Sequence, residues 1–149
     1  MPELYGHQFP EGLYYHKEYT WARPENGQAW VGLTDLFQYL AGDITNIELP
    51  EIGAAVRQGE PCGRVQSAKW IGYVYSPVTG KVVAVNEALR QDPALINESP
   101  YDKAWICAIE LSAWDNDAAG VMSKSAELEQ WVRDELAKLE EEGGVERGQ

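Results

Sequence analysis

Short runs of apolar and aromatic residues, separated by glycine and proline, fill the chain between residues 19 and 111. Runs of this length between turn signals are typical of β-strands. A hairpin is predicted around residues 24–27, because Asn26-Gly27 tolerates positive φ. In residues 81–85 the alternation favours a strand with Val83 and Val85 on one face. Further strands are predicted at residues 29–33, 44–49, 62–66, 73–75 and 105–111.

Two segments show helical spacing instead. Thr34-Asp35 is a helix N-terminus signal and Gly42 a stop signal, so a two-turn helix is predicted at residues 34–41. From Ser123 onward, apolar residues recur every three or four positions. This predicts an amphipathic C-terminal helix, capped by Ser123 or Ser125 and ended by Gly143-Gly144. Its apolar face consists of Leu128, Trp131, Val132, Leu136 and Leu139.

The polar stretch at residues 86–103 is predicted to be a loop, held to the core by Leu89 and Leu95-Ile96. Residues 51–60 and residues 76–87 have the same pattern, a turn, a strand and a turn, and resemble a weak internal repeat. They flank residues 65–73, which places that segment at the centre of a doubled unit.

The charge excludes some partners. Among 149 residues there are 24 acidic and 12 basic side chains, a net charge of -12. Residues 1–113 hold 14 acids and 8 bases and residues 114–149 hold 10 acids and 4 bases, so half of the excess lies in the last quarter. This balance argues against binding nucleic acid or an anionic membrane. Without an apolar run of spanning length or a signal-peptide pattern, a cytoplasmic location is expected.

Motifs for independent catalysis are missing from the sequence. His7 and His16 are not at metal-ligand spacing, and no nucleophile-elbow or phosphate-loop motif occurs. Asp115-Asn116-Asp117 starts like a calcium loop, but Ala119 and Ala126 occupy positions that need oxygen ligands. The sequence therefore predicts a protein that is not an enzyme by itself and has no metal site.

Lys69 stands between two strand-like runs, where a hairpin tip would expose it. Alone it would be an ordinary surface lysine. The surrounding motifs, in order and spacing, resemble the lipoyl-carrier H protein of the glycine cleavage system over about residues 14–113. They are IELPEIG at residues 47–53, QGEPCG at 58–63, QSAK at 66–69 and SPVTGKVVAVNE at 76–87.

The resemblance implies a mainly β fold, a barrel-sandwich hybrid in which two sheets form a flattened barrel. It implies that Lys69 becomes N6-lipoyllysine by the action of a lipoate ligase or other lipoylation machinery. The attachment turn would comprise Gln66, Ser67, Ala68 and Trp70. On this basis residues 1–113 are expected to form the carrier domain, and residues 114–149 an acidic helical extension.

The chain departs from the family pattern at three positions where the family usually has an acid. Gln66 replaces the Glu of the attachment turn, Tyr19-Thr20-Trp21 replaces His-Glu-Trp, and Tyr73 replaces an Asp. In the family these acids lie around the aminomethyl cargo, and an amine needs carboxylates. Their loss favours a cargo that is not an amine.

This pattern is most similar to the H-protein-like lipoate-binding proteins of heterodisulfide-reductase-like sulfur oxidation. That similarity implies a lipoyl arm that shuttles sulfur-containing intermediates or reducing equivalents, with a heterodisulfide-reductase-like complex and a lipoamide dehydrogenase as partners. One alternative is a glycine cleavage H protein that carries the aminomethyl group. Another is a binding or relay module without lipoate.

Three further questions stay open at this point. Cys62 and Cys107 are interpreted as core residues more readily than as redox residues. The aromatic and apolar residues near Lys69 either pack on the barrel edge or form a docking patch; they are Trp70, Ile71, Tyr73 and Tyr75. The C-terminal helix either covers the barrel, the preferred interpretation, or docks a partner.

Overall fold

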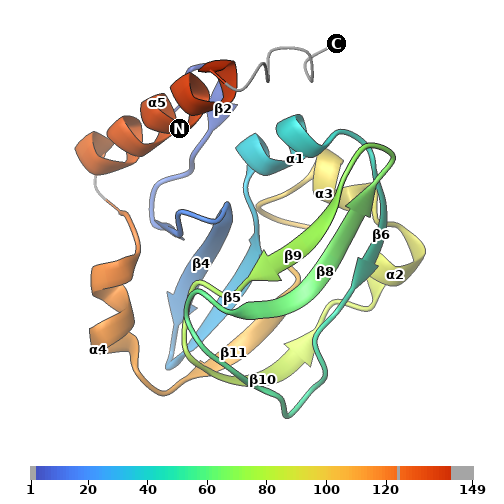
Figure 1. Cartoon of the computed structure of the whole chain (residues 1–149). Helices are drawn as coiled ribbons and strands as arrows, with labels where there is room; N and C mark the ends of the chain where they lie inside the picture. Colours follow the sequence, from blue (N-terminus) through green and yellow to red (C-terminus); the bar gives the residue numbers. More distant parts are fainter. Residues whose placement is uncertain (1–2, 124, 142–149) are drawn as a thin grey trace.

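Two facing β-sheets enclose the larger hydrophobic core of the computed structural model, which describes residues 3–123 and 125–141 (Figure 1). The fold is the flattened barrel-sandwich predicted from the sequence. One sheet has the strand order β3-β4-β5-β11-β10-β7, formed by Tyr14–Tyr15, Thr20–Glu25, Gln28–Leu33, Cys107–Leu111, Gly80–Val85 and Ala55–Val56. The other has the order β6-β8-β9, formed by Ile44–Glu48, Pro61–Ser67 and Ile71–Tyr75.

The β4–β5 hairpin turns at Asn26-Gly27, where φ is 53° and 80°. Positive φ at both residues is the two-residue turn that matches strand twist. The predicted four-residue turn was too long, because Pro24 pairs with Ala29 and Glu25 with Gln28 inside the ladder. Pro24 lies beyond the end of the two-residue β3, a position in a sheet where a missing N–H is tolerated.

Helix α1 (Asp35–Ala41) confirms the predicted short helix. The Thr34 side chain accepts a hydrogen bond of 3.2 Å from the Phe37 N–H, which satisfies one free donor at the helix N-terminus. Gly42, at φ 79°, ends the helix with its N–H on the Gln38 carbonyl. The buried face of α1, with Leu36 and Phe37, packs against both hydrophobic clusters.

In strand β10 the prediction that Val83 and Val85 share one face is wrong. Its ladder with β11 shifts register between Val82 and Ala84, and Val82 is the fully buried residue, while Val83 and Val85 are half-buried. A bulge reverses the side-chain alternation, which a regular period of two does not anticipate. β7 pairs with β10, so the two echoing segments of the sequence contact each other in the fold.

The segment predicted as a loop at residues 86–103 contains two one-turn helices, α2 (Ala88–Gln91) and α3 (Leu95–Glu98). Leu89 and Ile96 are buried, as predicted, and hold these helices to the core. The Asn86 amide donates to the Lys103 and Trp105 carbonyls, at 2.9 and 2.8 Å. These bonds close the segment between β10 and β11.

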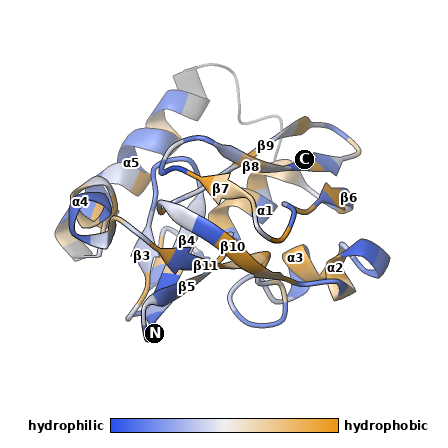
Figure 2. Cartoon of the chain, turned by 90° about the horizontal axis from the view of Figure 1, so that it is seen from below, coloured by the Kyte–Doolittle hydropathy of each residue, from blue (hydrophilic) through white to orange (hydrophobic). Residues whose placement is uncertain are grey.

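Helix α5 (Ser125–Glu141) packs on a second hydrophobic cluster formed with the N-terminal segment. Leu128 and Val132 are buried there against residues that include Phe9, Tyr15 and Trp21. Figure 2 shows α5 and α4 (Trp114–Asp117) on one side of the barrel and α2 and α3 on the other. The helix therefore covers the barrel, as preferred from the sequence. The Ser125 side chain and the stop predicted at Gly143-Gly144 lie outside the described part.

Smaller elements complete the chain. β1 (Glu3–Leu4) and β2 (His7–Gln8) form a two-stranded sheet, and a 3₁₀ turn at Ala118–Gly120 follows α4. Asp117 is buried and accepts hydrogen bonds from the Thr79 N–H and hydroxyl. None of the helices in residues 3–123 and 125–141 has the length and apolar character needed to span a bilayer.

Candidate functional site

Lys69 lies at the tip of the β8–β9 hairpin, as the sequence predicts. The Ser67 N–H donates to the Trp70 carbonyl at 2.8 Å, and the Ser67 hydroxyl accepts from the Lys69 N–H at 3.3 Å. Ser67 is buried, whereas Ala68, Lys69 and Trp70 are exposed. The hydrogen bonds of the buried Ser67 thus hold the turn, while Lys69 is exposed to solvent.

The side chain of Lys69 extends over the C-terminal end of α1. A Cβ placed on Gly42 would lie 3.1 Å from the Lys69 Cε and 3.7 Å from its Nζ. A positive charge near a helix C-terminus is favourable, because the last carbonyls carry partial negative charge. Glycine at position 42 both ends α1 and leaves room for the lysine stem.

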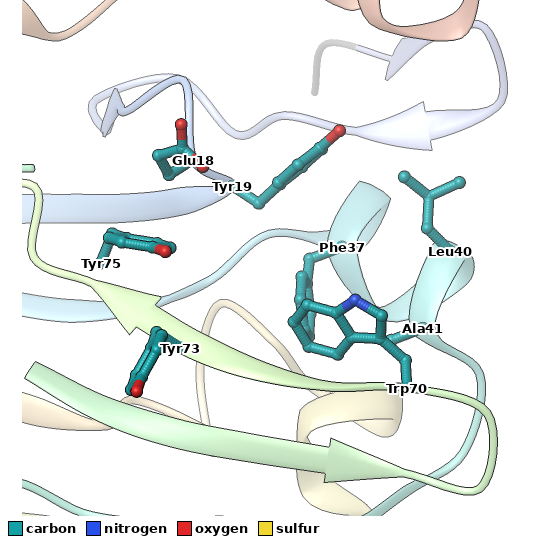
Figure 3. A pocket seen from close by; sticks show the side chains of 8 residues that line it. All are labelled: Glu18, Tyr19, Phe37, Leu40, Ala41, Trp70, Tyr73 and Tyr75. Carbon is teal, nitrogen blue, oxygen red and sulfur yellow. The ribbon is translucent and has the colours of Figure 1, made fainter. Parts of the chain in front are cut away.

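An apolar groove of about 270 Å³ lies beside the hairpin, between α1 and β9 (Figure 3). At one end the rings of Phe37 and Trp70 meet edge to face, with centroids 5.4 Å apart. Tyr19 lies on the opposite wall from Tyr73, and Glu18 is the one carboxylate among the described lining residues. The groove is lined by Glu18, Tyr19, Phe37, Leu40, Ala41, Trp70, Tyr73 and Tyr75.

Tyr19 reaches the groove from a strained backbone position. Its φ is 74°, a left-handed conformation that is rare for a bulky residue. The Tyr19 hydroxyl donates to Glu135 Oε1 at 2.5 Å, and its ring centroid lies 5.5 Å from that of Trp131. Helix α5 therefore supports one wall of the groove.

The three positions where the sequence departs from the family do not converge on one spot. Tyr73 lines the groove. Thr20 is fully buried, and its hydroxyl makes no hydrogen bond within the part of the chain that the structure describes. Gln66 is exposed and borders a separate shallow hollow between β6 and β8, together with Ile71. Of the three positions that lack the family's acid, Tyr73 is the one that lines the groove, and Tyr19, which stands where the family usually has His, lines it as well.

A larger polar cleft of about 550 Å³ adjoins the groove, since Glu18 and Tyr75 line both. Burial lowers the pKa of His16, which borders this cleft, and Lys17 lowers it further. The His16 Nδ1 accepts from the Glu18 N–H at 3.1 Å, which leaves any proton of the neutral ring on Nε2. Among residues 3–123 and 125–141, no three His, Cys, Asp or Glu side chains are grouped for a metal ion.

Sequence reasoning missed Phe37, Leu40 and Tyr19 as groove residues. The apolar stripe of α1 was visible in the sequence, but its position beside the hairpin depends on packing between distant segments. For the apolar residues next to Lys69, the sequence left open whether they pack on the barrel edge or form a docking patch. Trp70, Ile71 and Tyr73 are 42%, 55% and 51% exposed, so the hairpin presents an apolar surface.

Comparison with known proteins gives a consistent result. The family described as glycine cleavage H-protein matches residues 13–135. The glycine cleavage system H protein of Brevibacillus brevis is 48% identical over 105 residues, 70% of this chain and 83% of that protein. The H protein of Anoxybacillus flavithermus is 48% identical over 110 residues, 72% of this chain and 87% of that protein.

Among solved structures, the glycine cleavage system H protein of Mycobacterium marinum superposes with a TM-score of 0.65 at 30% identity. The match covers 74% of this chain and 97% of that one. The chain therefore belongs to the glycine cleavage H-protein family, whose members carry covalently attached lipoate and serve partner enzymes without being catalysts themselves.

Proposed function

We propose that this chain is a cytoplasmic lipoyl carrier whose lipoate is joined by an amide bond to the Nζ of Lys69. The observation that carries the proposal is the hairpin tip, where Ser67 fixes the turn and leaves Lys69 exposed. A modifying enzyme needs such a rigid, accessible turn, here made of Gln66, Ser67, Ala68 and Trp70. Residues 1–113 form the proposed carrier domain, and residues 114–149 its helical extension.

The groove beside Lys69 supports a swinging arm. Amide formation removes the lysine charge and with it the attraction to the C-terminal end of α1. The aromatic walls of the groove then offer the apolar dithiolane a surface on which its burial is favoured over exposure to water. Tethering keeps the arm at high effective concentration near each partner, which is the physical purpose of a carrier.

Sequence similarity favours glycine cleavage as the system that this carrier serves. Relatives at 48% identity are glycine cleavage system H proteins. On this basis the arm would carry the aminomethyl group between partner enzymes of that system. Transport of the aminomethyl group, which the sequence offered as an alternative to transport of sulfur, is the leading proposal for the cargo.

The groove supports a second candidate function. Tyr73 stands where the family usually has an Asp, and apart from Glu18 the wall consists of aromatic and aliphatic residues. Such a wall offers an ammonium group a single carboxylate, whereas an uncharged or sulfur-bearing arm needs none. The second candidate is therefore a carrier of sulfur intermediates or reducing equivalents, with a heterodisulfide-reductase-like complex and a lipoamide dehydrogenase as partners.

Lipoylation is tested by intact-mass spectrometry of the full chain made with a lipoylation system. We expect the mass of one lipoyl group on the wild type and on Lys81→Arg, a matched exposed lysine. Lys69→Arg is expected to gain none. A gain that survives Lys69→Arg would refute the assigned site, and no gain in the wild type would favour the relay module without lipoate.

The cargo is tested by incubating the lipoylated chain with glycine and glycine decarboxylase, with the Brevibacillus brevis H protein as the positive control. Aminomethyl loading at a comparable rate supports glycine cleavage. If loading fails while the arm takes up sulfur from a persulfide donor, the second candidate is supported and the leading one is rejected. Both readouts use the same lipoylated sample, so a failure of lipoylation is recognised separately.

A further inference from the structure

Strand β9 is an open edge of its sheet and differs in chemistry from the edge on the other side. Among the strands that the structure describes, β9 pairs with β8 alone. The exposed positions of the opposite edge, β6, hold Thr45, Asn46 and Glu48, which are all polar. The five residues of β9 are uncharged, and Ile71 and Tyr73 are exposed. Edge strands are usually protected by charge or proline, so this edge favours pairing with another strand.

The backbone of β9 has hydrogen-bonding groups that β8 does not use. The Ser67 N–H donates to the Trp70 carbonyl, so these two residues form a hydrogen-bonded pair at the hairpin tip. Along an antiparallel ladder such pairs alternate with pairs that are not hydrogen-bonded. Ile71 and Tyr73 lie one and three positions beyond the tip, in a regular part of the ladder. Their N–H and C=O groups therefore point away from β8, toward the open edge.

The groove beside Lys69 runs along this open edge. The Trp70 indole folds back over Gly72, where an added Cβ would lie 2.3 Å from the ring. Tyr73 and Tyr75 lie on the other face of the strand, with ring centroids 6.2 Å apart, because successive side chains point to opposite faces. Trp70, Tyr73 and Tyr75 all line the groove (Figure 3). A groove that adjoins both faces of β9 follows its edge.

The polar cleft continues the groove past the end of β9, since Glu18 and Tyr75 line both. His16, which borders the cleft, is 4% exposed. Its Nε2 lies 4.0 Å from an added Cβ on Gly59 and makes no hydrogen bond with any residue that the structure describes. Because Nδ1 is an acceptor, Nε2 carries the proton of the neutral ring. Groove and cleft thus form one slot, which offers this N–H to a backbone carbonyl.

We propose that the open edge of β9 binds an extended segment of a partner protein, which pairs with Ile71 and Tyr73 as an added strand. Main-chain pairing supplies affinity in such docking, and pockets for alternate side chains supply specificity. Apolar side chains at alternate positions of the segment enter the groove, because its walls are aromatic and aliphatic apart from Glu18. The docking edge goes beyond the proposed carrier function, since it needs no lipoate.

Charge identifies the rest of the segment. The Glu18 carboxylate borders both hollows and forms no ion pair within the part of the chain that the structure describes. Lys17 borders the cleft but not the groove. A basic side chain next to the apolar residues of the segment therefore pairs with Glu18. The net charge of -12 attracts such a segment and repels a second copy of the chain.

The test follows the backbone amide signals of the isotope-labelled full chain by NMR while the blocked peptide acetyl-Val-Thr-Val-Lys-Val-amide is added. We expect the signals of Ile71 and Tyr73 to shift at millimolar peptide. The unmodified chain is used, so a failure to bind leaves the carrier function untouched. Absence of these shifts, or shifts confined to residues outside the slot, would overturn the proposal.

Two altered peptides separate strand pairing from apolar contact alone. One is N-methylated at its odd positions and the other at its even positions, so that each keeps every side chain. Only one edge of an added strand faces β9, so one peptide should bind at least about fivefold more weakly and the other nearly unchanged. If both bind like the parent peptide, or both are weakened equally, β9 does not pair with the segment.

Two variants test the charge. Glu18→Gln should weaken binding of the parent peptide about two- to fivefold. Glu48→Gln removes the same charge at the opposite edge of the sheet and should leave binding unchanged. Equal effects of the two variants would contradict the pairing with Glu18. Shifts of Ile71 and Tyr73 that appear without peptide, as the protein is concentrated, would assign the edge to a second copy and overturn the choice of occupant.

Discussion

The Tyr19 hydroxyl donates a 2.5 Å hydrogen bond to Glu135 Oε1 and so joins the groove beside Lys69 to helix α5. The contact spans 116 residues of sequence. Tyr19 holds an unfavourable left-handed backbone conformation, and its ring packs on Trp131 and Phe37. The C-terminal helix is thus part of the structure that shapes the candidate site.

Replacement of Tyr19 by phenylalanine tests this link. The largely buried Glu135 carboxylate would lose the hydrogen bond that it accepts from the Tyr19 hydroxyl, so we expect Tyr19→Phe to lower the free energy of unfolding by about 1–2 kcal/mol. Urea denaturation measures this change. Tyr39→Phe, at an exposed tyrosine, is the control and should change stability by less than about 0.5 kcal/mol. Equal effects of the two substitutions would argue against the link.

The covering role of α5 is tested at Leu128. This residue is 5% exposed within the second cluster, so Leu128→Ala should lower the free energy of unfolding by about 3 kcal/mol. Lys138→Ala, on the exposed side of the same helix, is expected to change it by less than about 0.5 kcal/mol. If Leu128→Ala unfolded at the wild-type denaturant concentration, α5 would be a docking element and not a cover.

Local signals account for the parts of the fold that the sequence predicts correctly. Thr34 and Gly42 bound α1, and Asn26-Gly27 turns the hairpin, because each acts through its own backbone geometry. The face of β10 was wrong since a bulge depends on the partner strand. The groove could not be predicted either, because its walls come from three separate segments, residues 18–19, 37–41 and 70–75. The exposed place of Lys69 at a hairpin tip, by contrast, was predicted from the two strand-like runs on either side of it.

The buried histidines predict how stability depends on pH. Burial lowers the pKa of both His7 and His16 below 6.5, although Asp35 and Glu3 partly offset the effect at His7. Below about pH 6.5 the unfolded chain binds protons that the folded chain does not. This contribution to stability is therefore complete above pH 6.5 and is lost as the pH falls through the lower folded values.

We expect the melting temperature to fall between about pH 7.5 and pH 5.5, before most carboxylates titrate. His16→Asn is the informative variant, since its side-chain oxygen can still accept from the Glu18 N–H but does not titrate. Its melting temperature should depend less on pH over the same interval. A wild-type slope retained in this variant would show that His16 does not contribute.

Ser67 is predicted to matter more for modification than for stability. Ser67→Ala removes the hydroxyl that accepts from the Lys69 N–H, so the hairpin tip becomes less ordered. The backbone hydrogen bond from Ser67 to Trp70 is kept, so the hairpin itself is preserved. We expect lipoylation to slow several-fold while the free energy of unfolding falls by only about 1 kcal/mol. Time-resolved mass spectrometry measures the rate. Thr45→Ala, which loses a hydrogen bond to the Gln66 carbonyl, is the neighbouring control.

Tyr73 is the position at which the groove chemistry can be changed most directly. It lines the groove and is half exposed, so Tyr73→Asp places a carboxylate there without disturbing the core. A charge-assisted contact to an arm-borne ammonium would slow loss of the aminomethyl group about five- to tenfold. Tyr73→Asn separates charge from size, and Tyr39→Asp adds the same charge outside the groove. If Asn and Asp protect the loaded arm equally, or if neither does, the wall at residue 73 does not select the cargo by charge.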